Sequence, residues 1–289
     1  MENNISLYRT PEGEQAVMAM YDTVLKNWSA PYQTQMISTR QGDTFVITSG
    51  ETAAPALILL HGAGGNSSMW APDIADYSRH FRVYAVDLPG EAGKSTSNRP
   101  AWEGSAFVEW LEDVLNALNV DRATLVGISQ GAWTALKFAV VMPERVEKLV
   151  LIAPGGIVPD RLSFILRAVV LLSTGEWGAR RMVDSLFADQ PVLEVVKVNV
   201  ARMMRQFKGL IGRLPIFSDD ELRRLTMPVL LLGGTKDIMR DLSKIEARLR
   251  AFVPDLTVKS IVGGGHALIN TRSEVLDFLT TSELLHDQK

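Results

Sequence analysis

The sequence contains no cysteine, and histidine is scarce among its 289 residues. Without cysteine the chain has no disulfides, thiolate nucleophiles, iron–sulfur clusters or cysteine-ligated zinc sites. Any chemistry that needs an imidazole must therefore use one of very few side chains. The four histidines are His61, His80, His266 and His286.

Neither sign of charge dominates the sequence. It has 30 Lys and Arg residues against 33 Asp and Glu, a net charge of −3, which argues against a protein that binds nucleic acid through a basic surface. A hydrophobic content of 46% with 22% charged residues is typical of a folded domain rather than a disordered chain. The length suits one large domain, or one domain with an insertion.

Long apolar runs are also missing. The densest, Ala56–Leu60 and Ile165–Leu172, are far shorter than the ~18 residues of a membrane-spanning helix, so we expect no membrane span. The chain opens with Met-Glu-Asn-Asn, which lacks the positive and apolar regions of a secretory signal. Together with the absence of cysteine, this favours a cytoplasmic protein.

Short apolar runs of strand length alternate with helical patterns along most of the chain. The predicted strands are Ala56–Leu60, Arg82–Val86, Ala123–Val126, Lys148–Ile152, Val229–Leu232 and Leu256–Ile261. The predicted helices between and after them are Trp102–Leu118, Gln130–Met142, Ser243–Phe252 and Ala267–Leu279. Strands that are apolar on both faces and separated by helices indicate a parallel sheet with helices on both sides.

Two regions depart from this alternation. The N-terminal part predicts an amphipathic helix over residues 12–28 and then a hairpin of Thr34–Thr39 and Thr44–Thr48. Residues 156–226 contain only helical patterns, although strands flank them, and they are too long for a simple crossover. We interpret them as a helical cap over the carboxyl ends of the strands. The predicted organisation is a core of residues 1–155 and 227–289 with a cap of residues 156–226.

The predicted cap helices are Arg161–Leu172, Glu176–Phe187, Pro191–Phe207 and Ser218–Leu225. Their large apolar side chains include Phe164, Ile165, Trp177, Met182, Phe187, Met203, Met204 and Phe207. Methionine-rich surfaces adapt to varied shapes, which would suit a pocket for a small apolar ester. The alternative, that these side chains form the cap's own core, stays open.

The candidate nucleophile is Ser129 in the motif Gly127-Ile128-Ser129-Gln130-Gly131. A predicted strand precedes this motif and a helix follows it, which is the context that the G-x-S-x-G motif requires. The turn would expose the serine hydroxyl at a helix N-terminus, where negative charge is favoured. The alternative is a serine that only caps the helix.

A serine hydroxyl is a poor nucleophile at neutral pH and needs an adjacent base. Of the four histidines, His266 follows three glycines after the last strand, whereas the others lie in a polar tail, a turn or a glycine loop with another role. The candidate acid that orients it is Asp237, just past an apolar strand. Asp241 and Asp160 remain as substitutes for this acid, and Asp237 as a helix cap.

The glycine-rich segment His61-Gly62-Ala63-Gly64-Gly65 follows a predicted strand. Acyl transfer needs two donors directed at a developing oxyanion, and backbone N–H groups serve. We assign the N–H groups of Ala63 and Gln130 to this role. A nucleotide-binding loop is disfavoured, because neither a following Lys-Ser/Thr nor a complete G-x-G-x-x-G motif is present.

Together these motifs resemble the α/β-hydrolase superfamily over residues 35–280. The matching segments are H-G-A-G-G, D-L-P-G, G-I-S-Q-G, P-V-L-L-L-G-G-T-K-D and G-G-G-H. The resemblance implies a mostly parallel eight-stranded sheet flanked by helices, with a helical cap, and a chain order of Ser129, Asp237 and His266 as in that fold. Other segments, such as M-P-E-R-V, look like bacterial carboxylesterases known for naproxen esters.

One loop departs from the family pattern. Asp87–Ser95 reads D-L-P-G-E-A-G-K-S, one residue longer than the common D-x-P-G-x-G-x-S. In such folds this loop lies near the pocket, so family substrate preferences should not be transferred. Haloalkane dehalogenases and epoxide hydrolases of this fold would be expected to have aspartate in place of Ser129, which argues against both activities.

The prediction is a serine hydrolase that cleaves carboxylic esters of small apolar molecules through an acyl-enzyme, without a metal or organic cofactor. A thioesterase, a lactonase or a C–C bond hydrolase could use the same three side chains. A non-catalytic ligand receptor on the same fold is a further alternative. We expect a small-molecule ester as partner, with no nucleic acid and no membrane, and the sequence leaves the oligomeric state open.

Overall fold

A central sheet organises the molecule. Over residues 6–209 and 212–281, which the computed structural model describes, the strands form one eight-stranded sheet in the order β1-β2-β4-β3-β5-β6-β7-β8. The strands are β1 (Tyr32–Thr39), β2 (Gly42–Ser49), β3 (Ala56–Leu60), β4 (Arg82–Val86), β5 (Ala123–Ile128), β6 (Val146–Ile152), β7 (Val229–Gly234) and β8 (Leu256–Ile261). β1 and β2 pair antiparallel, as do β2 and β4, and all other neighbours are parallel. The predicted hairpin and the mostly parallel α/β sheet are confirmed.

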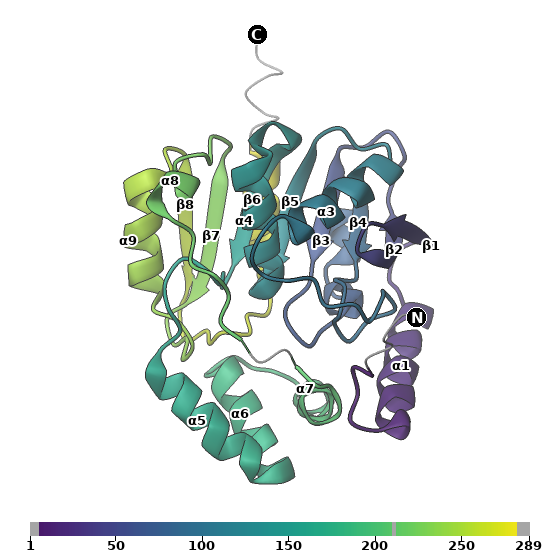
Figure 1. Cartoon of the computed structure of the whole chain (residues 1–289), viewed down its shortest axis with the longest axis vertical. Helices are drawn as coiled ribbons and strands as arrows, with labels where there is room; N and C mark the ends of the chain where they lie inside the picture. The colour runs from purple at the N-terminus through teal and green to yellow at the C-terminus, as the bar shows by residue number, and fades with distance from the viewer. Residues whose placement is uncertain (1–5, 210–211, 282–289) are drawn as a thin grey trace.

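Helices cover both faces of this sheet (Figure 1). The helices of the core are α1 (Pro11–Lys26), α2 (Ile74–Tyr77), α3 (Ala106–Ala117), α4 (Gln130–Val141), α9 (Leu242–Phe252) and α10 (Arg272–Thr280). Short 3-10 turns lie at Ser67–Trp70 and Pro143–Arg145. The coverage follows from strand geometry, because successive side chains of a strand point to opposite faces.

The two faces of β3 show this alternation. Ile58 and Leu60 belong to the cluster that also holds the buried residues of α3, α4 and α9. Leu57 and Leu59 belong to the cluster that holds those of α1, α2 and α10. All four side chains are fully buried, and each such burial stabilises the fold by about 1.5–3 kcal/mol. An uninterrupted apolar run is therefore what a strand between two helical layers requires.

The segment between β6 and β7 forms helices, as predicted. They are α5 (Leu162–Ser173), α6 (Gly175–Phe187), α7 (Glu194–Gln206) and α8 (Asp219–Leu222). In Figure 1, α5, α6 and α7 lie together beyond one end of the sheet, with α1 beside α7, whereas α8 lies with α9 against the sheet. The bridge between Ala188, after α6, and Gly264, after β8, places this group near the carboxyl ends of the strands.

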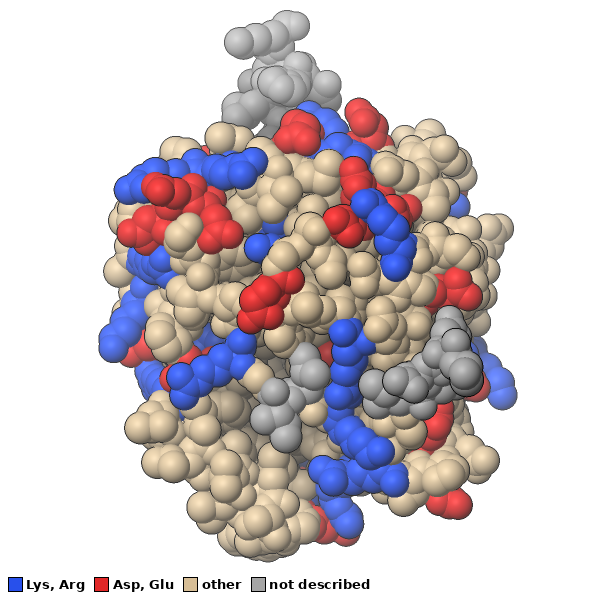
Figure 2. Space-filling model, in the orientation of Figure 1, with Lys and Arg blue, Asp and Glu red and all other residues tan. Residues whose placement is uncertain are grey.

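The helix α5 is the least packed element of this group. None of its residues is buried, and Leu162, Leu166, Val169 and Val170 are each at least 60% exposed. Figure 2 shows a broad uncharged surface at this end of the molecule, whereas basic and acidic side chains are interspersed elsewhere on the same face. Within the described residues, no helix combines the length and apolar character that crossing a membrane requires.

Several predicted boundaries differ from the structure, and the largest difference is at the start of the last helix. The helix expected at Ala267–Leu279 begins only at Arg272. The backbone before it is bonded to the cap segment instead: Ala267 N–H donates to Leu186 O at 2.9 Å, and Ile269 N–H donates to Gln190 Oε1 at 3.0 Å. Tertiary hydrogen bonds therefore replace the first helical turn that the apolar spacing predicts.

Candidate active site

Ser129 lies in a sharp turn between β5 and α4. Its backbone has φ 52° and ψ −104°, an uncommon conformation for a residue with a side chain. The turn packs directly on β3, because a Cβ atom at Gly131 would lie 2.1 Å from the Leu60 carbonyl oxygen. Only glycine fits there, so the motif's second glycine allows the turn to approach its neighbouring strand.

The structure brings Ser129, Asp237 and His266 together. His266 Nε2 lies 2.9 Å from Ser129 Oγ, and His266 Nδ1 lies 2.9 Å from Asp237 Oδ2. The imidazole and the carboxylate are both more than nine-tenths buried. With Nδ1–H donating to the carboxylate, Nε2 carries a free lone pair and accepts from the serine hydroxyl. This arrangement can remove the hydroxyl proton as Oγ attacks an electrophilic carbon.

Asp237 is held in its ionised form. Burial alone would raise its pKa, but the hydrogen bond and charge of His266, with the N–H groups of Met239 and Arg240, keep the pKa below its ordinary value. Those backbone groups donate to Asp237 Oδ1 at 2.7 and 3.2 Å. One carboxylate oxygen is therefore anchored by the loop after β7, and the other is available to the imidazole.

The two substitute acids have other partners. Asp241 accepts from Ser243 N–H at 3.2 Å and caps α9, the role that its position predicts. Asp160 pairs with the Arg240 guanidinium, with Nε and Oδ1 2.7 Å apart. The geometry thus favours Asp237 as the acid next to the histidine.

The loop that carries His266 is tied to the cap. Gln190, between α6 and α7, donates from Nε2 to Ala267 O at 2.7 Å and accepts from Ile269 N–H. Ala267 N–H donates to Leu186 O at the end of α6. The cap therefore helps to fix the position of the imidazole, a connection that the sequence did not indicate.

The other two described histidines lie elsewhere. His61 is fully buried at the end of β3, where Nε2 accepts from Leu88 N–H at 2.9 Å and Nδ1 donates to Gly62 O. Burial lowers the pKa of His61, so this ring is a neutral link between the ends of β3 and β4. His80 is exposed, and His286 lies outside the described residues.

The glycine-rich loop after β3 passes beside the serine. A Cβ atom at Gly62 would lie 3.8 Å from Ser129 Cβ, and Gly65 N–H closes a turn onto Gly62 O at 3.1 Å. Ala63 is exposed at this turn. Gln130 is the first residue of α4, where a backbone N–H has no partner within the helix.

A buried glutamate beside this loop is not among the candidate residues that the sequence analysis names. Glu91 is 5% exposed and accepts from Gly64 N–H at 2.6 Å and from Gln130 Nε2 at 2.9 Å. Burial raises its pKa to about 7, although the two hydrogen bonds and the charge of Arg99 act in the opposite direction. The only signal in the sequence is the additional residue in Asp87–Ser95, a loop that the resemblance places near the pocket.

The rest of that loop has a structural role. Asp87 is fully buried and accepts from Tyr21 Oη at 3.0 Å, from Ser67 N–H at 2.7 Å and from Lys94 N–H at 2.8 Å. It therefore joins α1, the turn after β3 and its own loop. Within the described residues, no group of three or more histidine and acidic side chains is arranged to hold a metal ion.

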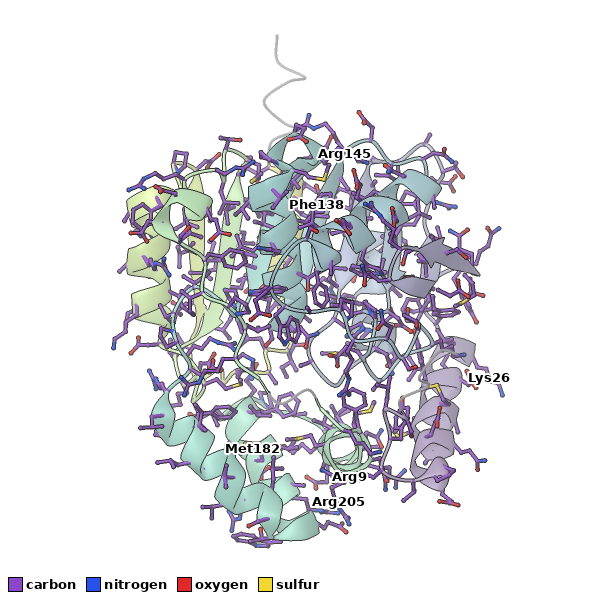
Figure 3. All side chains as sticks on the ribbon, viewed as in Figure 1. Arg9, Lys26, Phe138, Arg145, Met182 and Arg205 are labelled. Carbon is purple, nitrogen blue, oxygen red and sulfur yellow. The ribbon has the colours of Figure 1, made fainter. Side chains whose placement is uncertain are left out.

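The apolar side chains of the cap have divided roles. Phe187 and Met204 pack in the cluster between α6 and α7, whereas Phe207 and Met203 pack on the N-terminal residues Leu7, Tyr8 and Val17. Trp177 is 59% exposed. Met182, labelled on α6 in Figure 3, is buried. Many of the large apolar side chains of the predicted cap thus serve as local core rather than as one continuous pocket wall.

Comparisons with known proteins agree with the fold. The sequence pattern of the Alpha/beta hydrolase family matches residues 57–277. "Uncharacterized carboxylesterase nap" of Bacillus subtilis is 32% identical, over 92% of this chain and 88% of its own length. "Carboxylesterase YbfK" of the same organism is 33% identical, over 90% and 92%. The crystal structure of naproxen esterase (carboxylesterase NP) from Bacillus subtilis superposes with a TM-score of 0.82 at 31% identity, over 94% of this chain and 99% of that one.

Proposed function

The chain belongs to the alpha/beta hydrolase family and is a hydrolase of the carboxylesterase type, and from that premise we propose that it cleaves carboxylic esters of small apolar molecules through an acyl-enzyme on Ser129. The proposal rests above all on the two hydrogen bonds of His266, one to Ser129 Oγ and one to Asp237 Oδ2. They join a nucleophile, a base and an acid in one chain of contacts.

In the proposed first step, Ser129 Oγ attacks the ester carbonyl while His266 Nε2 takes its proton. Asp237 keeps the proton of the ring on Nδ1 and stabilises the imidazolium that forms. The N–H groups of Ala63 and Gln130 donate to the oxyanion of the tetrahedral intermediate. His266 then protonates the leaving alcohol, and the acyl group stays on Ser129.

In the second step, His266 removes a proton from water as the water attacks the acyl carbonyl. The imidazolium then returns that proton to Ser129 Oγ as the bond between Oγ and the acyl carbon breaks and the acid leaves. The same oxyanion donors serve both steps, because each passes through a tetrahedral intermediate. All proton transfers run through one imidazole, and no metal or organic cofactor is assigned a role.

The proposal extends to organisation and location. We assign residues 156–226 to a cap and residues 1–155 and 227–289 to the core, since the helices α5, α6 and α7 lie together and α6 leads into the segment that holds the loop of His266. The ester class is supported by the carboxylesterase relatives, and small apolar molecules are proposed from the apolar composition of the cap segment, much of which packs as local core. The cysteine-free sequence suits a reducing compartment, and we propose the cytoplasm.

Active-site labelling tests this function. A fluorophosphonate should phosphonylate Ser129, located by mass spectrometry of the labelled peptide, and should block turnover of p-nitrophenyl esters of graded acyl length. The exposed hairpin variant Ser38→Ala is the matched control and should label as the wild type does. A label on another residue, or hydrolysis that continues in the fully labelled protein, would reject the assignment.

Substrate profiling with the same protein separates the neighbouring activities. We expect p-nitrophenyl esters of short and medium chains to be better substrates than thioesters, lactones or compounds that require C–C cleavage. Preferred turnover of one of those classes would change the reaction but retain the three residues. Binding without turnover in the wild type would instead identify a receptor on this fold.

A further inference from the structure

We propose that Glu91 is the positioning residue that fixes the two oxyanion donors relative to each other, an inference that rests on the proposed function. Glu91 lies in the loop after β4, and its carboxylate reaches both segments that carry these donors. Oε2 accepts from Gly64 N–H at 2.6 Å, and Oε1 accepts from the Gln130 side chain at 2.9 Å.

The two contacts join segments that the sheet alone does not connect at this point. Gly64 is the neighbour of Ala63 in the turn after β3, so a hydrogen bond to its N–H orients the turn that presents the Ala63 N–H. Gln130 supplies the second donor from its own backbone at the start of α4. One carboxylate therefore spans the gap between the donors, with its two oxygens assigned one to each side.

The backbone around Glu91 is itself well anchored. Gly90 N–H donates to Thr96 O at 2.9 Å, and Ala92 O accepts from Asn66 Nδ2 at 2.8 Å. The side chain is therefore presented from a fixed base. Each of its two carboxylate oxygens has a polar partner.

Burial of this carboxylate has a cost that packing alone does not justify. Taking an acidic group out of water is unfavourable unless hydrogen bonds and charges compensate for it. An apolar side chain of similar volume would avoid the cost, so the acceptor function is the feature that distinguishes Glu91. The positive charge that acts on it comes from Arg99, whose Nε donates to Gly90 O at 3.3 Å.

The expected effect is on the transition state. The oxyanion exists only after attack on the carbonyl, so loosened donors should lower kcat with little change in KM. Misplacement of a reacting group by about 1 Å can cost about 100-fold in rate. A purely structural glutamate would instead change stability and leave the kinetics of the folded enzyme intact.

Two substitutions separate the acceptor function from charge and volume. In Glu91→Gln the amide oxygen still accepts from Gly64 N–H, and its NH₂ donates to Gln130 Oε1 once that amide rotates by half a turn. In Glu91→Leu the volume remains but both acceptors are lost. Leu249→Ala, which truncates a fully buried side chain of α9 against the sheet, is the control for general loss of stability.

The experiment measures kcat and KM with a p-nitrophenyl ester and with its thionoester, in which C=S replaces C=O. Sulfur is larger and a weaker hydrogen-bond acceptor, so the ester-to-thionoester ratio of kcat/KM reports on the oxyanion donors. We expect Glu91→Leu to lose about 10- to 100-fold in kcat and to show a lower ratio. Glu91→Gln should recover most of kcat with the wild-type ratio, and Leu249→Ala should keep both after thermal melts confirm folding.

The outcomes distinguish this inference from the proposed function. Wild-type kcat in folded Glu91→Leu, or a loss of kcat with an unchanged ester-to-thionoester ratio, would overturn the role of Glu91. If Glu91→Leu does not fold, Gln130→Ala takes its place, because it removes the partner of Glu91 Oε1 and keeps the backbone N–H of residue 130. A lower kcat with a lower ratio in that variant would support the role of Glu91, and wild-type values of both would overturn it. Ser129→Ala measured in parallel tests the proposed function itself, since wild-type turnover in that variant would remove both proposals.

Discussion

The chemistry of the candidate site depends on how individual carboxylates are placed. Asp237 and Glu91 are both buried, yet their surroundings act in opposite directions. His266 and two backbone N–H groups hold the pKa of Asp237 below its ordinary value, whereas burial raises that of Glu91 to about 7. The first is therefore ionised at neutral pH beside the imidazole of His266, and the second changes charge near neutral pH.

Glu91 leads to a prediction about stability and pH. Its pKa is 4.5 in the unfolded chain and about 7 in the folded protein, so between these values the folded state binds the additional proton. The group therefore destabilises the fold increasingly as pH rises from 4.5 through 7, and Glu91→Gln removes that dependence. Relative to the wild type, Glu91→Gln should gain about 2–3 kcal/mol in the free energy of unfolding between pH 5 and pH 8.

Urea denaturation of both proteins at the two pH values measures this difference, and all other titrating groups cancel in the comparison. A difference between the two proteins that is the same at pH 5 and pH 8 would show that the carboxyl titrates alike in the folded and unfolded states. A larger advantage of Glu91→Gln over the wild type at pH 5 than at pH 8 would mean that the pKa of Glu91 is lowered by folding rather than raised.

At the scale of elements, hydrophobic patterning predicts the strands better than the helix ends. The bounds of β3 and β4 coincide with the predicted runs, because a strand between two helical layers must be apolar on both faces. The start of α10 could not be predicted in the same way. Its expected first turn is bonded to Leu186 and Gln190, which only the folded chain brings near.

The turn between β5 and α4 depends on the absence of a side chain at Gly131. Gly131→Ala would place a Cβ atom 2.1 Å from Leu60 O and should cost about 3 kcal/mol or more of stability, because backbone atoms on both sides must shift. Gly104→Ala is the control, since its Cβ atom would meet nothing within 4 Å and only the strain of a φ near +79° remains. That strain costs about 1 kcal/mol.

Chemical denaturation of both variants tests this packing argument. The expected order is wild type, then Gly104→Ala, then Gly131→Ala, with the last also losing activity because Ser129 sits in the same turn. Equal losses for the two variants would mean that the close approach of the turn to β3 is not required.

Across the whole molecule, the parallel sheet brings distant residues to one edge. Ser129 and His266 are 137 positions apart, and Asp237 and His266 are 29 apart. Each follows the carboxyl end of a strand, so motifs and chain order were sufficient to predict that they meet. The fold of the sheet and its helices is consistent with the family match and with the carboxylesterase structures that superpose at a TM-score of 0.82.

The surroundings of these residues were much harder to predict. Glu91 is an ordinary acidic residue in a loop, and its partners lie 27 and 39 positions away. The link from Gln190 to the loop of His266 spans 77 positions. Neither contact has a motif, because both depend on where folded loops pass. The sequence therefore predicts the candidate reacting groups, whereas the supports of the site become visible only in three dimensions.

In the proposed mechanism, turnover depends on the hydroxyl of Ser129. Steady-state ester hydrolysis by Ser129→Ala measures this dependence. We expect kcat to fall by about 10⁴- to 10⁶-fold in this variant, with a melting temperature close to that of the wild type. Hydrolysis at a rate near that of the wild type would contradict it.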